Sequence, residues 1–290
     1  APVSEWLGSH VYAALGIPVH ETVLGIRDGR IVCACRDFTF PDSRLVNFHD
    51  LKNSLSDDEP GFTEDASTGS GVVLADVRSA IHRIPVLRSI DGVSDRFWDM
   101  FVVDAFIRNI DRNNTNWGVL RNPRGEFSLA PVYDNGNSFN NKRTDSGIER
   151  RLANPDLIRQ DALDVRSCYV TDKGKPIAPL KYLASGQDEE CTKALDRFME
   201  RYDPRSFHDL LGSIPSMSHG LTVVPDGFHE YHRRVCDYRY EHAFMEAWRD
   251  LHPTVGVPSS PEASVPEPLP DPDPSVLPSS VPTCFDGPGM

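Results

Sequence analysis

The chain has 290 residues, of which 39% are hydrophobic, enough to build a sizeable core in one domain or in two lobes. Its formal net charge of −13 and its lack of a basic stripe exclude direct nucleic-acid binding as the main role, because phosphate backbones are bound by clustered Lys and Arg. The six cysteines show no zinc-ligand spacing, and neither a signal peptide nor an apolar run of about 18 residues occurs. We therefore expect a cytoplasmic protein without a membrane partner.

An amphipathic helix is predicted over residues 4–15, where apolar side chains recur at helical spacing. Ser4 is the expected N-cap, and Gly16 is the residue expected to end the helix. Glu5 lies in the first turn, a position that the helix dipole by itself favours for an acidic side chain.

A β-hairpin is predicted next, because two short apolar runs flank a polar turn that contains Asp and Gly. Its strands are residues 21–26 and 31–35, and its turn is 27–30. Cys33 and Cys35 lie two residues apart on one face of the second strand, and we expect them to be buried thiols rather than metal ligands.

The middle of the chain alternates between polar and apolar stretches. Residues 53–70 are polar and acidic and predict a loop, whereas residues 72–84 return to helical spacing. The apolar run 97–107 is long enough for three turns of buried helix. Within it, Asp104 is a candidate buried carboxylate that accepts hydrogen bonds from Arg112 or from backbone amides, because an unpaired buried carboxylate is costly.

Polar residues 109–116 follow that helix and predict a loop held at the end of a core element, where functional side chains are often mounted. Asp111 and Asn116 stand in the D-x-x-x-x-N spacing of the catalytic loop of protein kinases. A hairpin then leads to Asp134, with strand 117–120, turn 121–125 and return strand 126–133.

These residue types suit phosphoryl transfer. Asp111 is placed to act as the base or to orient the attacking hydroxyl, while Asn116 and Asp134 are placed as ligands of Mg²⁺ on the nucleotide phosphates. We expect Arg112 to brace the loop rather than to touch the substrate. The alternative is an ordinary polar turn after a core helix, followed by an Asp-Asn-Gly hairpin turn.

Two further helices and a tail are predicted in the last third of the chain. Residues 188–201 form an amphipathic helix with an acidic start, and 227–251 carry an aromatic stripe typical of core packing. From residue 253 to 290 the chain is rich in Pro and Ser and contains no Lys or Arg, which predicts a disordered acidic tail that is dispensable for folding.

The motifs together resemble the HipA-like kinase family, bacterial serine/threonine kinases of which some are the toxins of toxin–antitoxin pairs. The resemblance covers about residues 1–250 and is strongest over 97–138. It is carried by Asp111-Arg-Asn-Asn-Thr-Asn-Trp-Gly118, Leu129-Ala-Pro-Val-Tyr-Asp-Asn-Gly136, Ser4-Glu-Trp-Leu7 and Gly16-Ile-Pro-Val19. A small departure is Asn113, since many members have His after Asp-Arg.

The resemblance implies an α+β, protein-kinase-like fold of two lobes. Residues 1–52 would form a partial N-lobe and the hinge, 53–252 a mainly helical C-lobe, and 253–290 the tail. It also implies ATP and Mg²⁺ as cofactors, a protein substrate and, for a toxin-type member, a cognate antitoxin.

Three more site residues follow from the resemblance. Glu5 corresponds to the helix carboxylate that pairs with a phosphate-binding Lys, although the helix dipole alone also accounts for it. Arg36 and Phe38 correspond to the hinge, where backbone groups meet adenine.

One larger departure concerns the start of the chain, because kinases of this type have a glycine-rich loop and a strand-borne Lys before the helix at residue 4. Neither precedes it here, so the sequence is interpreted either as N-terminally truncated or as a degenerate kinase. Two alternatives therefore stand beside the active protein kinase: a non-catalytic binding module and a small-molecule phosphotransferase. We expect the chain by itself to transfer phosphate slowly or not detectably.

Overall fold

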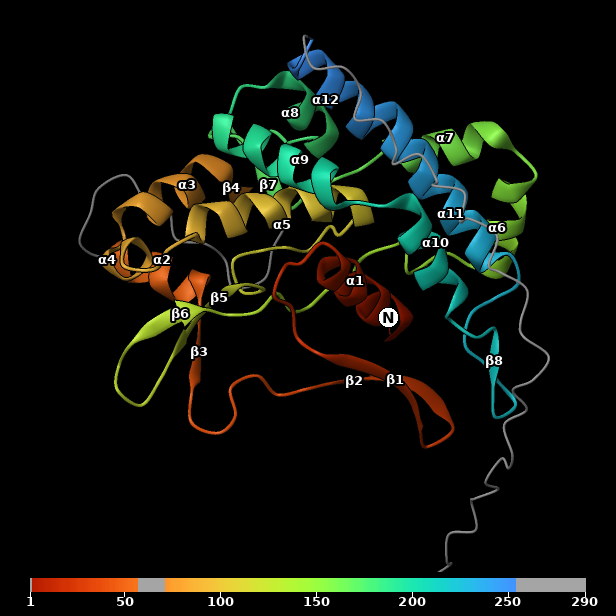
Figure 1. The fold of residues 1–290 in the computed structure, drawn as a ribbon, viewed down its shortest axis with the longest axis horizontal. Helices are drawn as coiled ribbons and strands as arrows, with labels where there is room; N and C mark the ends of the chain where they lie inside the picture. Colours follow the sequence, from red (N-terminus) through yellow and green to blue (C-terminus); the bar gives the residue numbers. More distant parts are fainter. Residues whose placement is uncertain (1, 57–70, 254–290) are drawn as a thin grey trace, which may run out of the picture. The chain divides into compact units, whose positions relative to one another are not determined.

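The computed structural model describes residues 2–56 and 71–253, which belong to one compact unit of helices and small sheets (Figure 1). The predicted loop 57–70 and the tail beyond residue 253 lie outside the described residues. The helices are α1 (Pro2–Ala14), α2 (Phe48–Ser56), α3 (Leu74–Arg83), α4 (Pro85–Arg88), α5 (Val93–Ile107), α6 (Asp145–Leu152), α7 (Pro155–Leu163), α8 (Pro179–Ser185), α9 (Glu189–Arg201), α10 (Pro204–Gly212), α11 (Phe228–Arg239), a π-helical turn (Tyr240–Phe244) and α12 (Met245–Leu251).

In the described part of the chain the strands are short and form four small sheets. Their bounds are β1 (Thr22–Arg27), β2 (Arg30–Cys35), β3 (Arg44–Asn47), β4 (Val72–Val73), β5 (Gly118–Arg121), β6 (Phe127–Leu129), β7 (Tyr169–Val170), β8 (Met217–Ser218) and β9 (Leu221–Thr222). Strands β1 and β2 pair antiparallel, as do β8 and β9, while β3, β5 and β6 form a three-stranded antiparallel sheet and β4 pairs parallel with β7. This mixture of helices with small sheets confirms the predicted α+β class.

Helix α5 is the centre of the hydrophobic core and packs against α9 (Figure 1). It contains the predicted three turns 97–107 and begins four residues earlier, at Val93. Its buried side chains point in all directions around the axis, as expected of a helix enclosed by the protein. Phe97, Trp98 and Phe106 are fully buried, and each stabilises the fold by about 1.5–3 kcal/mol relative to an exposed position.

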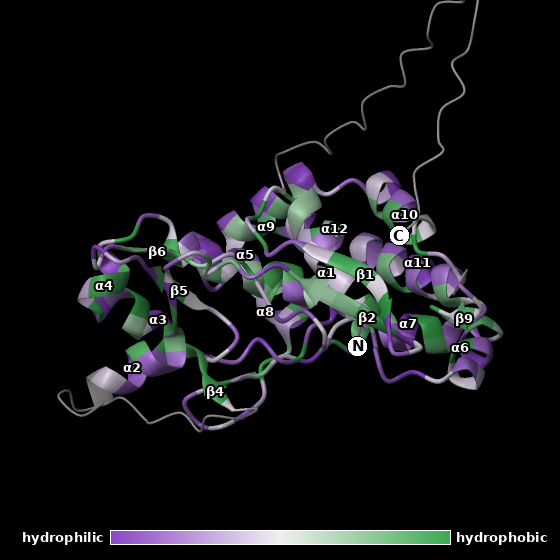
Figure 2. Cartoon of the chain, turned by 90° about the horizontal axis from the view of Figure 1, so that it is seen from below, coloured by the Kyte–Doolittle hydropathy of each residue, from purple (hydrophilic) through white to green (hydrophobic). Residues whose placement is uncertain are grey.

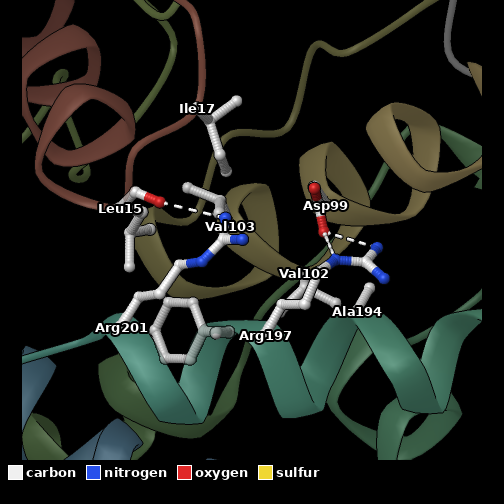
Figure 3. A pocket seen from close by; sticks show the side chains of 9 residues that line it. Leu15, Ile17, Asp99, Val102, Val103, Ala194, Arg197 and Arg201 are labelled. Atoms are coloured by element: carbon white, nitrogen blue, oxygen red, sulfur yellow. Dashed lines mark hydrogen bonds and ion pairs between the residues drawn. The ribbon is translucent and has the colours of Figure 1, made fainter. Parts of the chain in front are cut away.

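Polar contacts fix the packing of α9 against α5 and the end of α1 (Figure 3). Arg197 of α9 donates to Asp99 of α5 at 2.8 Å, and Arg201 donates to the carbonyl of Leu15 at 3.3 Å. The cavity between them has a volume of about 10 Å³, room for no more than a water-sized molecule. It is therefore a packing gap and no ligand site.

Helix α1 differs from the prediction at its start. It begins at Pro2, so Ser4 lies inside the helix and is buried rather than being its N-cap. The predicted end is confirmed, because Gly16 has a φ of +69°, which favours glycine. Gly8 lets α1 lie close to the segment after Asp134, since an added Cβ would be 2.7 Å from the Cβ of Asn135.

The predicted return strand 126–133 is shorter in the structure, where β6 ends at Leu129. The chain leaves the sheet there because Val132 pairs instead with the segment after α1. Its N–H donates to the carbonyl of Pro18, and its carbonyl accepts from the N–H of His20, both at 2.9 Å. This pairing of Val132 with the segment after α1 brings Asp134 next to α1.

Gly118 permits the close approach of β5 to β3, since a Cβ would lie 2.3 Å from the carbonyl oxygen of Val46.

The β1–β2 hairpin is confirmed, but the expected burial of its two thiols is wrong: Cys35 is exposed and Cys33 only half-buried. Figure 2 shows hydrophobic residues in both strands, yet Val23 is 66% exposed. A two-stranded sheet covers neither of its faces by itself, so alternation along the strand does not ensure burial.

Several remaining predictions can be compared with the structure. The helix 188–201 is confirmed, with Asp188 as the N-cap of α9, whereas the helix 227–251 contains the π-helical turn. The predicted lobe boundary at residues 52 and 53 falls within α2, so the division into lobes stays a prediction. No helix in the described part of the chain is long and apolar enough to cross a membrane.

Candidate active site

The loop after α5 is shaped by the last turn of that helix. Arg108 has a φ of +56° and ends the helix in the left-handed region. The side chain of Asn109 then bridges the turn: its Nδ2 donates to Asp104 at 3.1 Å, and its Oδ1 accepts from the N–H of Asp111 at 3.1 Å. Asn109 therefore links the helix end to the first candidate catalytic residue.

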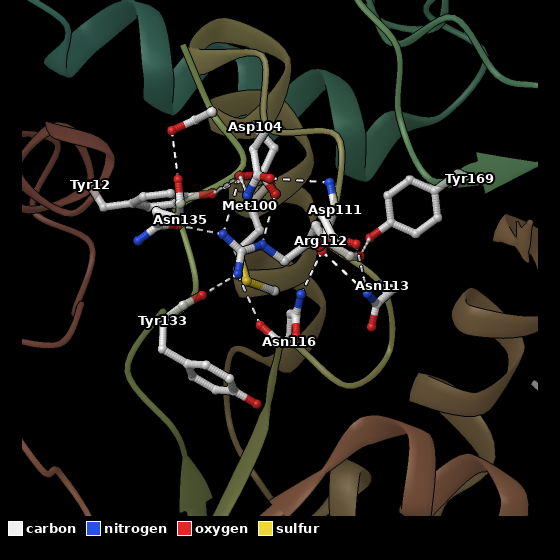
Figure 4. A network of polar contacts seen from close by, with 12 residues as sticks. Tyr12, Met100, Asp104, Asp111, Arg112, Asn113, Asn116, Tyr133, Asn135 and Tyr169 are labelled. Atoms are coloured by element: carbon white, nitrogen blue, oxygen red, sulfur yellow. Dashed lines mark hydrogen bonds and ion pairs between the residues drawn. The ribbon is translucent and has the colours of Figure 1, made fainter. Parts of the chain in front are cut away.

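Arg112 lies at the centre of the site and is only 1% exposed (Figure 4). Its Nε donates to Asp104 at 2.9 Å, and the hydroxyl of Tyr12 in α1 donates to the same carboxylate at 2.8 Å. Burial by itself lowers the pKa of the Arg112 guanidinium, but the charge and hydrogen bonds of Asp104, together with the neighbouring tyrosines, outweigh burial and raise the pKa. The predicted pairing of Asp104 with Arg112 is confirmed.

The same guanidinium joins two segments of the chain. It donates to the carbonyls of Asn116 and Tyr133 and, at 2.6 Å, to Oδ1 of Asn135 (Figure 4). The loop 109–116 and the segment that carries Asp134 are thereby held against one another by one buried side chain. Arg112 braces the loop, as predicted.

Asp111 is half-buried, and amide groups hold both of its carboxylate oxygens. Asn113 Nδ2 donates to Oδ1 at 2.9 Å, and Asn137 Nδ2 donates to Oδ2 at 2.7 Å. Each oxygen keeps a second lone pair with which it can accept a further hydrogen bond. The carboxylate is therefore fixed in orientation while still able to receive a hydroxyl proton.

Asn116 is oriented by the backbone of its own loop. Its Nδ2 donates to the carbonyl of Asp111 at 2.7 Å, and its Oδ1 accepts from the hydroxyl of Thr115 at 3.3 Å. Because the nitrogen is engaged in this way, Oδ1 is the atom with which Asn116 can bind a cation.

Asp134 follows Tyr133 with a φ of +55° and has an exposed side chain. Desolvation by the surrounding protein and the negative charges of Glu5 and Asp111 raise its pKa, while the positive charge of Arg112 opposes them. Three carboxylates therefore act on one another electrostatically at this site. A divalent cation there would relieve their repulsion.

Glu5 lies against the Asp134 segment rather than apart from it. Its Oε1 accepts from the N–H of Asn135 at 3.0 Å and contacts Nε2 of His20 at 2.8 Å. Burial would raise the pKa of Glu5, but the hydrogen bonds from His20 and Asn135 outweigh it, so the pKa is lowered from 4.5. The geometry brings Glu5 to the site, and its role toward a nucleotide stays a prediction.

The two predicted hinge residues, Phe38 and Arg36, lie in surroundings that differ from each other. Phe38 packs against Tyr133, with the ring centroids 5.5 Å apart, and so lies beside the residue that precedes Asp134. The side chain of Arg36 forms an exposed ion pair with Glu21 at 2.8 Å, and its backbone N–H donates to the Glu21 carbonyl. Contact of either residue with a nucleotide stays a prediction.

Three residues of the site were not found from the sequence. Asn137 orients Asp111, Asn135 connects Arg112 to α1, and His20 pairs with Glu5. Asn135 and Asn137 follow Asp134 directly, so a run of amide side chains beside a candidate metal ligand was the available signal. For His20 no local pattern distinguishes this position, because its partner is 15 residues away.

Known proteins resemble this chain in sequence and in fold. No family model matches the chain. The chain is 33% identical over 217 residues to the serine/threonine-protein kinase CtkA of Helicobacter pylori strain J99, a match that covers 74% of this chain and 64% of that protein. The chain therefore spans less than two thirds of the length of this curated relative.

Solved structures extend the comparison to the fold. The crystal structure of the H. pylori proinflammatory kinase CtkA matches with a TM-score of 0.77 and 29% identity, over 87% of this chain and 88% of that chain. HipA of Shewanella oneidensis, solved with HipB and operator DNA, matches with a TM-score of 0.44 and 11% identity, over 85% of this chain and 57% of that chain. The sequence match and the shared fold show that this chain is related to the serine/threonine-protein kinase CtkA, which agrees with the resemblance of the motif block to HipA-like serine/threonine kinases.

Proposed function

We propose that this chain binds ATP with Mg²⁺ and transfers the terminal phosphoryl group, slowly when it acts by itself, to a serine or threonine hydroxyl of a protein. The observation that carries the proposal is the buried guanidinium of Arg112, which joins the loop of Asp111 and Asn116 to the segment of Asp134. Phosphoryl transfer depends mainly on positioning and charge stabilisation, so a rigid connection between these segments suits it. The class of acceptor is taken from the printed name of the relative CtkA.

The donor atoms fit Mg²⁺. Oδ1 of Asn116 and the carboxylate of Asp134 are hard oxygen ligands, which Mg²⁺ prefers. The raised pKa of Asp134 supports a cation there, since part of the rise comes from the charges of Glu5 and Asp111. When bound, the metal ion supplies positive charge that neutralises the nucleotide phosphates.

We assign to Asp111 the contact with the substrate hydroxyl. Its two oxygens are fixed by Asn113 and Asn137, so the carboxylate is oriented before a substrate arrives. Such preorganisation avoids the cost of orienting the group during the reaction. Asp111 then accepts a hydrogen bond from the hydroxyl and receives its proton as the hydroxyl oxygen bonds to the terminal phosphorus of ATP, while the bond from that phosphorus to the leaving ADP oxygen breaks.

Titration of the 290-residue chain with ATP, with and without Mg²⁺, tests the assignment of the two carboxylates. Asp134→Asn removes a charged metal ligand and is expected to weaken Mg²⁺-dependent ATP binding by roughly 10–100-fold, as expected for a lost charged contact of about 1.5–3 kcal/mol. Asp111→Asn removes a group that faces the hydroxyl and should change ATP affinity by less than about threefold.

The matched control is Asp172→Asn, which neutralises an exposed acidic residue in a turn before Gly174. It is expected to bind ATP like the parent chain in both conditions. Equal losses for Asp134→Asn and Asp111→Asn would contradict the proposed division of roles. Binding without any dependence on Mg²⁺ would favour the non-catalytic binding module.

Transfer is tested with radiolabelled ATP and a serine- and threonine-rich acceptor protein, followed by identification of the labelled residue. Any transfer should fall by roughly 10²–10⁴-fold in Asp111→Ala, the usual contribution of a positioned acid–base group. Label in a small-molecule hydroxyl but not in protein would favour the small-molecule phosphotransferase. An antitoxin partner, which the family resemblance implies for toxin-type members, stays a prediction.

A further inference from the structure

Three side chains of different chemistry meet beside the candidate active site. A carboxylate oxygen of Glu5, a ring nitrogen of His20 and the sulfur of Cys35 all lie within 4.8 Å of one another. They come from three separate places in the fold, namely α1, the segment that leads into β1, and the end of β2. Among the described residues this is the group whose donor atoms are gathered closely enough to share one ion.

We propose that Glu5, His20 and Cys35 form a binding site for a thiophilic divalent cation of the Zn²⁺ class. Zn²⁺ takes carboxylate oxygen, imidazole nitrogen and thiolate sulfur together, whereas Mg²⁺ prefers oxygen alone. The site is therefore chemically distinct from the Mg²⁺ ligands proposed above, although it is next to them through the hydrogen bond from Asn135 to Glu5.

The geometry requires only a small rearrangement. Metal–ligand bonds of about 2.0–2.3 Å in a tetrahedron put the ligand atoms roughly 3.5 Å apart. The oxygen of Glu5 and Nε2 of His20 are already 2.8 Å apart and would separate slightly. Cys35 is exposed, so its sulfur can turn toward them with little change in the surrounding protein.

The surroundings supply fixed ligands on one side and access on the other. His20 is 7% exposed and Glu5 is held by the amide of Asn135. The hydroxyl of Ser9 lies 3.1 Å from Nε2 of His20 and can turn to accept elsewhere when that nitrogen binds a cation. The exposed side of Cys35 leaves a fourth position open to water, as in zinc sites with three protein ligands.

Cobalt provides the direct test, because Co²⁺ replaces Zn²⁺ in such sites and thiolate ligation gives a charge-transfer absorption. The full chain is titrated with Co²⁺ and then with Zn²⁺. We expect one Co²⁺ per chain with a thiolate band, displaced by Zn²⁺ but not by a large excess of Mg²⁺. This readout does not depend on ATP binding or on transfer, so it can fail while the proposed function stands.

Variants assign the ligands. Cys35→Ser changes an exposed residue, so it should leave folding intact and abolish the thiolate band. His20→Gln should weaken Co²⁺ binding by more than the roughly 10–100-fold that loss of an outer-shell partner costs. Cys191→Ala is the control, since it removes a buried thiol of α9 that is not in the group, and it should keep the band.

Cys33→Ser sharpens the test, because its thiol interacts with that of Cys35 on the same strand. With the three proposed ligands present, this variant should keep the band. Absence of a thiolate band in the parent chain would overturn the proposal. A band that survives Cys35→Ser, or one that disappears equally in Cys33→Ser, would overturn the assignment of the ligands.

Discussion

Among the residues that the structure describes, two arginines are almost fully enclosed, and both contact the last turns of α5 in different ways. Arg112, at the candidate site, donates to the carboxylate of Asp104. Arg239, in α11, donates to the backbone carbonyls of Phe106, Asp161 and Ala162. Both buried guanidinium groups have hydrogen-bond acceptors, but of the two only Arg112 also has a hydrogen-bonded carboxylate that neutralises its charge.

The difference appears in their pKa values. Burial lowers the pKa of Arg239, and its neutral carbonyl partners do not reverse this, whereas Asp104 raises the pKa of Arg112 despite its burial. Arg239 connects α11 with α5 and α7, elements that make up the body of the protein. Arg112 connects the two segments that carry the proposed catalytic groups. We infer that Arg239 serves stability and that Arg112 serves stability and the geometry of the site together.

The largest effect is expected when Arg112 loses its counter-ion. Asp104→Ala leaves a buried guanidinium without its carboxylate and should lower the free energy of unfolding by about 3–5 kcal/mol. Urea denaturation of the parent chain and the variant measures the loss.

A double variant separates the lost ion pair from the lost volume. Asp104→Leu combined with Arg112→Met removes both charges, and a buried ion pair can often be replaced by apolar residues at little cost. The loss of unfolding free energy in the double variant should therefore be smaller than the sum of the losses measured for Asp104→Leu and Arg112→Met separately. Simple additivity would show that charge pairing is not what holds this centre together.

A smaller loss is expected at the other arginine. Arg239→Met removes the donors to three carbonyls but also relieves the desolvation of an unneutralised charge, so we expect a loss of about 2 kcal/mol. ATP affinity of the folded variant should stay unchanged, whereas Arg112→Met should lose both stability and ATP binding. A loss of ATP binding in Arg239→Met would remove the distinction between the two centres.

The smallest effect concerns Glu5, a carboxylate at the site that is paired without a buried arginine in direct contact. Its pKa is lowered in the folded protein, so its ionised form stabilises the fold. That contribution is fully present above the unfolded value of 4.5 and is lost as the pH falls through the lower folded value.

Glu5→Gln should therefore lower the free energy of unfolding at neutral pH by about 1 kcal/mol, the net value of a typical hydrogen bond. The difference between parent and variant should begin to shrink as the pH falls below 4.5 and should disappear below the lower pKa of folded Glu5, where both carry a neutral side chain. Thermal unfolding over a pH series measures it. A difference that is constant with pH would mean that packing, not charge, accounts for the contribution of Glu5.

Local chemistry in the sequence determined the helix that ends in Ile107, the polar loop after it, and the candidate roles of Asp111, Asn116 and Asp134. It also predicted that Asp104 has a hydrogen-bond partner, either Arg112 or backbone amides, because an unpaired buried carboxylate is costly, and the structure shows Arg112 in that place. The helix and the loop are confirmed because periodicity, turn chemistry and the cost of burial act over a few contiguous residues, whereas the roles of Asp111, Asn116 and Asp134 stay predictions.

Only the tertiary structure decided which other side chains surround the candidate catalytic residues and hold them in place. Asn135 reaches Glu5 and Ser9 across more than 120 residues of sequence, and His20 meets Glu5 because the chain after α1 pairs with Val132. The exposure of Cys35 was decided in the same way: alternation along β2 tells which side chains share a face, but whether another element covers that face depends on packing. Contacts of this kind carry no local signature, since the chain entropy of closing a long loop is offset by the whole core and not by the residues that happen to meet.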